Sequence, residues 1–430
     1  MADLDDVRRW VTRGILLLLL LIILTPLAMV GFWSYQARAE VARIRARGEP
    51  TTLAELGNGK VPDAENADLV YAPILKMLSR PSAEKDTETL SKFLSPNQRA
   101  KNPELWGKAK SILAQYPSIV ELTERAQAKP DCRFPIEYTK GYPMEFPRLK
   151  RLVMLSRLLS TAAILDARNH HTERAVKSAE LAVGLGGIIE NEPSLLHYLM
   201  RVAIISSATS GLKGVLQYGE VSEAQAERLS SILGNIDLDD QYKRAMQGER
   251  VLYLEGAEAT VESSLPEEQK AAGTFMLRVI RLPDEAFTLS CMGQIAKLSR
   301  LSYSEAKSRG LCFEKNSHYP ICSLLGRRLL SISGRSLRSH NIGKARIELS
   351  KTALRLYAYR RQRTSYPNTL AQMGVESPED PFTGKDFIYK PKGKGFILYS
   401  IGPNLKDDGG VIPREKKSIR DEGDIVWEMP

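Results

Sequence analysis

The sequence predicts a mainly α-helical protein with a transmembrane helix near its N-terminal end, an antiparallel helical-hairpin body resembling a solenoid or bundle, and a small α+β C-terminal module. Three observations support this fold class: an uncharged apolar run, apolar residues at three- and four-residue spacing, and β-prone runs between turn motifs. We expect five segments: a tail (1–13), an anchor (14–33), a juxtamembrane and extended or helical segment (34–147), a helical-hairpin domain (148–336) and a helix plus β module (337–430).

The anchor is predicted from the run between Gly14 and Trp33, which contains no charged residue. About twenty apolar residues are enough to cross a bilayer as a helix. Trp10, Trp33 and Tyr35 lie near the ends of this run, where amphipathic rings favour the interface. A cleaved signal peptide is the alternative, because Ala37-Arg38-Ala39 has the form of a cleavage site, but the run is longer than a typical signal segment. We therefore favour an uncleaved anchor in the lipid bilayer through residues 14–33.

The orientation of this anchor is less strongly encoded. Three arginines precede the run and four follow it closely: Arg8, Arg9 and Arg13, then Arg38, Arg43, Arg45 and Arg47. The positive-inside rule is therefore nearly balanced. Because an N-terminal signal anchor usually leaves its short tail inside, we expect a single-pass inner (cytoplasmic) membrane protein with the bulk of the chain on the periplasmic, extracytoplasmic side.

Helical hairpins are predicted for the body. Short helices are expected at Leu69–Leu78, Glu84–Leu94 and Pro103–Gln115, and residues 130–147, rich in proline and aromatic side chains, are expected to be non-helical. Longer helices are expected from Phe146, from an N-cap at Thr172, from Leu195 to about Gln217, and after a capping box formed by Ser222 and Gln225. Residues 150–187 have about the length of one tetratricopeptide unit but lack its aromatic and proline positions.

The net charge of +10 is concentrated in one stretch. Residues 327–363 contain eleven Lys or Arg residues and a single acid, Glu348. No nucleic-acid-binding signature accompanies them, so nucleic acid is an improbable partner. A solvated face, or one that pairs with an acidic partner or with anionic lipid, is the favoured interpretation. The four cysteines (Cys132, Cys291, Cys312 and Cys322) lack metal-ligand spacing; Cys312 and Cys322 either close a short loop or, like the others, remain free.

The C-terminal module is predicted from residues with defined turn and strand chemistry. A helix from Lys344 to Arg363 is expected to stop before Tyr366-Pro367, because proline cannot extend the ladder. Asp380-Pro381-Phe382-Thr383-Gly384 has turn chemistry. Strands are expected at residues 387–389, 396–399 and 425–427, with residues 391–395 as a hairpin loop.

These residues resemble the C-terminal domain of the major pseudopilins of type II secretion systems. The resemblance covers about 353–427 and rests on Tyr366-Pro367, Asp380-Pro381 with Gly384-Lys385, residues 399–402 and residues 407–410. The whole layout also resembles large membrane-anchored proteins of planctomycete-type bacteria. The resemblance implies an antiparallel sheet packed on a helix and an acidic loop that holds calcium through Asp407, Asp408 and Asp424.

Two features limit what the resemblance implies. Calcium needs six to eight oxygen ligands, and the sequence Asp407-Asp408-Gly409-Gly410 is equally typical of a solvated turn. The pseudopilin processing site is absent, and the anchor lies some 300 residues before the module, so assembly into a fibre is not implied.

No catalytic motif accompanies this architecture: no H-E-x-x-H, no G-x-S-x-G and no phosphate-binding glycine loop is present. The sequence therefore predicts a non-enzymatic, membrane-anchored envelope protein that acts as an interaction or scaffold module with a protein partner. The alternative is an envelope hydrolase whose site is built from acids and histidines of the helical domain, with Glu190, Glu192 and His197 as its candidates.

Overall fold

The computed structural model describes residues 4–56, 61–134, 136, 138, 146–256, 258–259, 265–282, 285–309, 324–374, 377–411 and 423–430. Only the backbone is described at residues 4–7, 22–23, 26–27, 146–147, 279–280, 324–330 and 333. The described chain is mainly helical, with a three-stranded antiparallel sheet at its C-terminal end. The coarse fold class predicted from the sequence is therefore confirmed.

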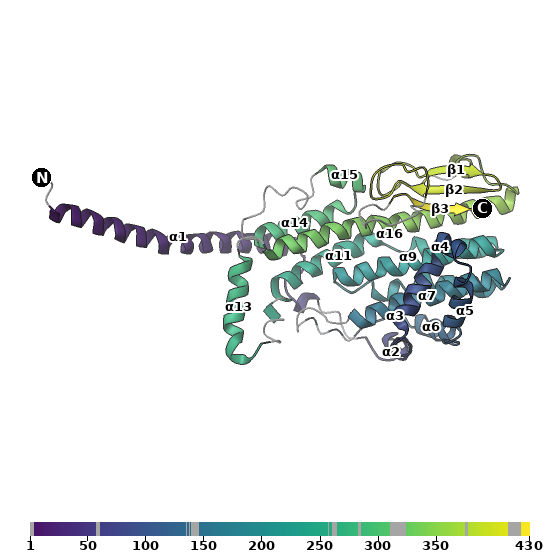
Figure 1. The fold of residues 1–430 in the computed structure, drawn as a ribbon, viewed down its shortest axis with the longest axis horizontal. Coiled ribbons are helices and arrows are strands. Elements are labelled where there is room, and N and C mark those ends of the chain that lie inside the picture. The colour runs from purple at the N-terminus through teal and green to yellow at the C-terminus, as the bar shows by residue number, and fades with distance from the viewer. Residues whose placement is uncertain are drawn as a thin grey trace.

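Helix α1 (Leu4–Ala46) has two halves with opposite environments. Its N-terminal half projects from the body as a lone rod (Figure 1), and Leu16, Leu17 and Leu18 are each about 60% exposed. Its C-terminal half enters the body, where Ala37 and Ile44 are buried. The change from exposed to partly buried side chains occurs at Trp33 and Ser34, so no linker separates the apolar run from the body.

A layer of short helices follows α1. It consists of η1 (Ala54–Leu56), α2 (Asp68–Met77), α3 (Ala83–Leu94), α4 (Pro96–Lys101), α5 (Leu105–Leu113) and α6 (Ile119–Gln127). The three predicted short helices are found, while α4 and α6 were not anticipated. Phe93 and Leu90 of α3 are fully buried, and α2, α3, α5 and α6 all contact α7.

The body is a bundle of longer helices around α9 (Leu195–Tyr218). Its other members are α7 (Phe146–Arg168), α8 (Thr172–Gly184), η3 (Gly187–Ile189), α10 (Glu223–Gly234), α11 (Leu238–Val251), the π-helical turn η4 (Leu252–Gly256), α13 (Glu267–Arg281), α14 (Glu285–Leu298), α15 (Tyr303–Ser308) and α16 (Leu324–Arg363). Helices α7, α8, α11 and α16 all contact α9. Among the described residues, α9 is the helix long and apolar enough to cross a membrane, but 72% of its most apolar window is buried in the body. A helix that is hydrophobic on every side and surrounded by protein is a core helix.

Small residues let α9 approach α7 closely. A Cβ at Gly211 would lie 2.7 Å from Cβ of Ser160, and one at Gly214 would lie 2.5 Å from Cγ1 of Ile164. Real Cβ atoms do not pack at such distances, so the contact between the two longest helices of the hairpin region depends on these glycines.

Helix α16 is longer than the sequence predicts. It begins at Leu324 rather than Lys344 and continues without a break to Arg363, across the predicted segment boundary at 336/337. Residues from α2 through β3 share one hydrophobic cluster. At 1.5 Å per residue, its 40 residues span about 60 Å, from the region where α1 leaves the body to the sheet (Figure 1).

The sheet consists of β1 (Ile388–Lys392), β2 (Gly395–Ser400) and β3 (Ile425–Met429), in the order β1-β2-β3. Ile388 pairs with Tyr399, and Ser400 pairs with Ile425. Lys392 pairs with Gly395, so the hairpin turn is only Gly393-Lys394, shorter than the predicted loop 391–395. Phe396 and Leu398 of β2 are fully buried, and β2 and β3 pack on α16.

One predicted helix cap is wrong. His171, not Thr172, occupies the N-cap position of α8, and its side chain makes no capping hydrogen bond. The Thr172 hydroxyl instead accepts from the backbone N–H of Glu220 at 3.4 Å. By contrast, Ser222 and Gln225 form the predicted capping box of α10, in which each side chain bonds the other residue's N–H.

Candidate functional site

Each of the three predicted calcium residues already accepts hydrogen bonds within the protein. The Asp408 carboxylate accepts from the Asn404 side-chain amide at 2.8 Å. Both carboxylate oxygens of Asp424 accept backbone N–H bonds, from Asp408 at 3.2 Å and from Gly410 at 2.7 Å. Asp407 accepts from the Tyr399 hydroxyl at 2.9 Å and from the N–H of Gly409 at 2.8 Å. These bonds connect the loop to the start of β3 and to β2.

The described part of this loop does not by itself offer a calcium shell. No group of three or more acid, histidine or cysteine side chains able to hold one ion is found among the described residues, and residues 412–422 of the loop lie outside them. The two carboxylates also differ in their surroundings. Hydrogen bonds from Gly409 and Tyr399 lower the pKa of exposed Asp407. Burial raises the pKa of Asp424, although the hydrogen bonds that it accepts from two backbone N–H groups oppose the rise.

A third carboxylate, Asp380, explains why two separate motifs of the module belong together. Its buried Oδ1 accepts from the N–H of Phe382 at 2.9 Å and from the Ser400 hydroxyl at 2.8 Å, and Oδ2 accepts from the N–H of Ile401 at 3.2 Å. Burial raises its pKa, and the three donors oppose that rise. Asp380 therefore ties the 380–384 turn to the end of β2. Its position in a turn motif was visible in the sequence, but its distant partners were not.

The same turn docks on the body. Backbone N–H groups of Tyr303 and Ser304, at the start of α15, donate to the carbonyls of Pro381 and Phe382 at 2.8 and 2.9 Å. The ring of Tyr303 packs edge-on against Phe382, with their centroids 5.5 Å apart. On the other side of the module, Lys213 of α9 faces the ring of Trp427 at 6.0 Å, and burial lowers its pKa to about 8.

The candidate residues of a hydrolase site do not face a common cavity. Glu192 is buried and accepts from the Tyr138 hydroxyl, and burial raises its pKa. His197 is buried at the start of α9, where its Nδ1 lies 2.9 Å from the Ser194 hydroxyl, and burial lowers its pKa to about 4. Glu190 is half-exposed and pairs with Arg201 at 3.1 Å. Each side chain thus has its own partner and serves local structure.

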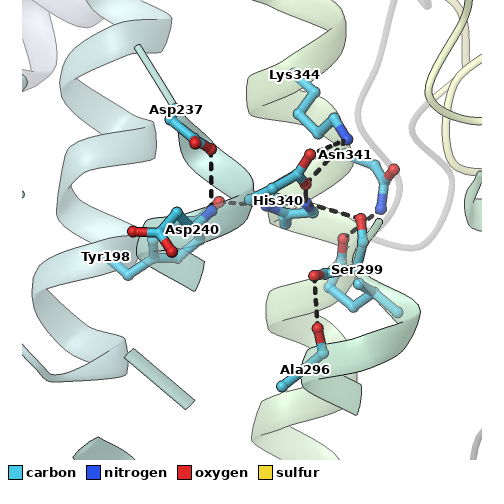
Figure 2. A network of polar contacts seen from close by, with 10 residues as sticks. Tyr198, Asp237, Asp240, Ala296, Ser299, His340, Asn341 and Lys344 are labelled. Atoms are coloured by element: carbon cyan, nitrogen blue, oxygen red, sulfur yellow. Dashed lines mark hydrogen bonds and ion pairs between the residues drawn. The ribbon is translucent and has the colours of Figure 1, made fainter. Parts of the chain in front are cut away.

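A buried polar network centres on His340 of α16 (Figure 2). His340 Nδ1 lies 2.6 Å from the Tyr198 hydroxyl, and Nε2 lies 2.9 Å from Oδ1 of Asp239 and 3.2 Å from the Ser299 carbonyl. Lys344 Nζ lies 3.0 Å from both oxygens of Asp239. The network connects α9, α11, the end of α14 and α16.

The partners of His340 define its protonation state. Two acceptors face Nε2, so that nitrogen carries the proton, and Nδ1 then accepts from Tyr198. Burial lowers the pKa of His340 although Asp239 opposes the shift, so the ring is neutral at pH 7. Burial alone would raise the pKa of Asp239, but His340 and Lys344 outweigh it and hold the value at about 2. Each polar atom of the ring is satisfied, and the network is a structural joint between four helices. Sequence reasoning missed it, although His340 lies at helical spacing from buried Leu337.

The basic stretch 327–363 does not form one solvated face. Lys344 pairs with Asp239, and Lys351 pairs with Glu348 at 2.9 Å. At the far end of α16 an exposed group remains, made of Arg355, Arg360, Arg361 and Arg363. Among the described side chains of the stretch, some positive charge is therefore paired internally, and some is exposed, both at Arg335 and at the C-terminal end of α16.

Where α1 enters the body, it borders an open groove of about 550 Å³. One wall is the α1 segment that includes Ser34, Ala37 and Arg38, and the other is the junction of α13 and α14. Arg281 of that junction is buried and donates to Glu285 at 2.7 Å and to the carbonyl of Tyr253 at 3.0 Å.

The thiols carry no assigned chemistry. Cys291 is buried in the core, and burial raises the pKa of Cys132 to about 12, which leaves Cys132 an unreactive thiol at pH 7. The predicted loop pair, Cys312 and Cys322, lies outside the described residues, as does His318. Comparisons with protein-family models, with curated proteins and with solved structures found no match.

Proposed function

We propose that the chain is a membrane-anchored, non-enzymatic interaction or scaffold protein of the cell envelope. The observation that carries this proposal is the contrast within α1. Its leucines from Leu16 to Leu21 are about half or more exposed, although the body buries almost all of its own large apolar side chains. A helix with twenty uncharged residues is expected to be covered by lipid when its described side chains are open to solvent over most of this length.

The anchor places the body directly on the membrane surface. Side chains of α1 become partly buried at Trp33 and Ser34 and Ala37 is the first buried one, so the body starts within about 6 Å of the run along the helix axis. Helix α16 then extends away from that point for about 60 Å, and the β module packs along its distal part. We propose that the module is a membrane-distal recognition surface.

This geometry favours one of the two partners considered for the basic stretch. The exposed arginines Arg355, Arg360, Arg361 and Arg363 lie at the distal end of α16. Electrostatic attraction to a membrane decays over a Debye length of about 8 Å at physiological salt. Anionic lipid of the bilayer that holds α1 is therefore too far away, and an acidic protein surface is the proposed partner for this end.

Membrane flotation and protease accessibility test the anchor and its orientation. The full chain, expressed in a Gram-negative host, is expected to float with membranes after an alkaline carbonate wash and to lose its body to protease added to spheroplasts. A matched variant, Leu18→Arg with Leu21→Arg, places two charges in the apolar run, each costing about 2.5–3.5 kcal/mol at the helix centre, and is expected to lose flotation. If the parent chain remains in the soluble fraction together with the variant, the anchor is refuted. If protease leaves the body of the parent chain intact in spheroplasts, the orientation is reversed.

Calcium binding in the acidic loop is a separate prediction. Titration calorimetry of the full chain in lipid nanodiscs tests it directly, with Asp407→Ala as the control, because Asp407 is exposed and its loss spares the buried contacts of Asp424. Heat from the parent chain that disappears in the variant would establish the site, and no heat from the parent chain would end the idea.

The hydrolase alternative has no specific observation in its favour. Glu192 and His197 are buried against separate partners, and the grooves found among the described residues include neither of them. We therefore do not propose a reaction.

A further inference from the structure

The feature behind this inference is α13, the helix that stands apart from the bundle. Figure 1 shows α13 crossing the direction of α1 and α16 at a steep angle, beside the point where α1 leaves the body. If α1 spans a membrane along its own axis, a helix that crosses α1 steeply lies near the membrane plane.

The depth of α13 follows from its contact with α1. The groove described above joins Arg278, Arg281 and Leu282, at the C-terminal end of α13, to the α1 segment from Ser34 to Arg45. This segment lies one to twelve residues beyond Trp33, which is about 1.5 to 18 Å along the helix axis. The polar interface of a bilayer is about 5–7.5 Å thick on each side. The membrane-proximal edge of the groove, at Ser34 and Arg38, falls within this layer, so this end of α13 borders the lipid headgroups.

The exposed surface of α13 suits that level. Phe275 and Met276 are 65% and 55% exposed, and Ala271 and Ala272, one helical turn earlier, are exposed beside them. Outside α1, only three other large hydrophobic side chains of the described residues are comparably exposed: Leu69, Ile332 and Val411. Two adjacent large apolar side chains on one helix are the kind of surface that enters the boundary between headgroups and acyl chains.

The orientation of α13 is held by ion pairs, of which those of Arg281 are buried and that of Arg278 is exposed. Arg281 donates to Glu258 at 3.0 Å and to Glu285 at 2.7 Å. Arg278 forms two bonds to Glu258, at 3.1 and 2.7 Å. These contacts fix the C-terminal end of α13 against the bundle, so the helix is presented at a set angle.

We propose that α13 is an interfacial helix: it lies in the headgroup layer of the bilayer that α1 spans, with Phe275 and Met276 inserted between lipids. The partner is the lipid surface itself, and the inference rests on the proposed anchoring. The body then contacts the membrane at two places, the transmembrane rod and the in-plane helix. Two contacts restrain the tilt of the body, which a single anchor does not.

Quenching by brominated lipid tests this contact. The full chain with Phe275→Trp is reconstituted in vesicles of phosphatidylcholine and phosphatidylglycerol, with phosphatidylcholine brominated on the upper part of its acyl chains. The added emission, measured as the difference from the parent chain, is expected to fall about twofold, because an interfacial ring sits about 5–10 Å into the boundary. The matched control is Leu69→Trp, since Leu69 is similarly exposed (52%) but lies on α2, in the layer of short helices. Its emission is expected to stay unchanged.

Each other outcome has a definite meaning. The parent chain carries Trp10 and Trp33 at the ends of the apolar run, so its own quenching reports whether α1 is in lipid. If the parent is quenched and the emission added by Phe275→Trp is not, the in-plane helix is refuted and the anchor stands. If the emission added by Leu69→Trp is quenched as strongly as that added by Phe275→Trp, the contact is not specific to α13 and the inference fails. If the parent is not quenched at all, the anchor fails, and the inference fails with it.

Discussion

Replacing Tyr198 with Phe removes a single hydroxyl from the network around His340. That hydroxyl donates to Nδ1 of the buried ring at 2.6 Å, and no other partner of Nδ1 is present among the described residues. Leaving a buried acceptor unpaired costs about 1–3 kcal/mol. We expect Tyr198→Phe to lower the free energy of unfolding of the body by this amount.

The companion change, His340→Phe, keeps an aromatic ring at the site. The ring of His340 has its centroid 4.7 Å from that of Tyr242, so the replacement retains this packing. It leaves the Tyr198 hydroxyl without an acceptor and Asp239 without one of its donors. In this background Tyr198→Phe removes an orphaned hydroxyl, so its cost is expected to fall to zero or below. The difference between the two backgrounds is the coupling free energy of the pair, about 1–3 kcal/mol.

The measurement is urea unfolding of the four proteins of this cycle in lipid nanodiscs, followed by far-ultraviolet circular dichroism. Tyr116→Phe is the matched control, because Tyr116 is equally buried and its hydroxyl has no hydrogen-bond partner among the described residues. That control is expected to change the free energy of unfolding by less than about 0.5 kcal/mol. An equal cost of Tyr198→Phe in both backgrounds would show that the hydrogen bond is not formed.

Three further predictions follow from burial and packing. Gly248→Ala would place a Cβ 1.6 Å from the Pro193 carbonyl oxygen, so it is expected to destabilise the body by about 1–3 kcal/mol or more. Gly293→Ala lies in the middle of α14 with open space around it, so it is expected to stabilise the body by about 0.5–1 kcal/mol. Thermal unfolding measures both changes, and opposite results would contradict the packing. For His197, the pKa is about 4 in the folded chain against 6.5 in the unfolded chain, so the unfolded state binds more protons between these values and stability falls as pH falls. Between pH 7 and pH 4, the free energy of unfolding of the parent chain is expected to fall by about 3 kcal/mol more than that of His197→Gln. If the free energies of unfolding of the two proteins change in parallel with pH, a neutral buried ring is excluded.

Local patterns in the sequence were sufficient to predict most elements. The capping box at Ser222 and the proline after Tyr366 place one helix start and one helix end almost correctly, because both signals act through neighbouring backbone groups. The start of α16 was placed twenty residues late, at Lys344 instead of Leu324, since Gly334 and Gly343 weaken the helical pattern and their compatibility with a helix depends on packing. The space at Gly343, for example, is set by Leu238 and Val202.

The candidate sites show the same division. Asp407, Asp408 and Asp424 belong to one short module, and a backbone N–H bond links Asp408 to Asp424, but these partners were not foreseen, and calcium binding there stays a prediction. The partners of His340 come from residues 101 and 142 positions away, and such distances carry no signal in a single sequence. The exposure of Phe275 and Met276 is equally invisible, since an apolar pair in an amphipathic helix is ordinarily buried.

The absence of a linker after Trp33 has a mechanical consequence. A flexible tether would let the body sample many directions, but a helix that continues into the core couples the rotation of the anchor to that of the whole bundle. Two copies diffusing in one membrane with the same orientation would then meet only with their long axes roughly parallel and their β modules at equal height. Encounters between neighbours then become a two-dimensional search in which only the rotation about the membrane normal varies. Any ligand held by one module is presented to the next at the same height above the membrane.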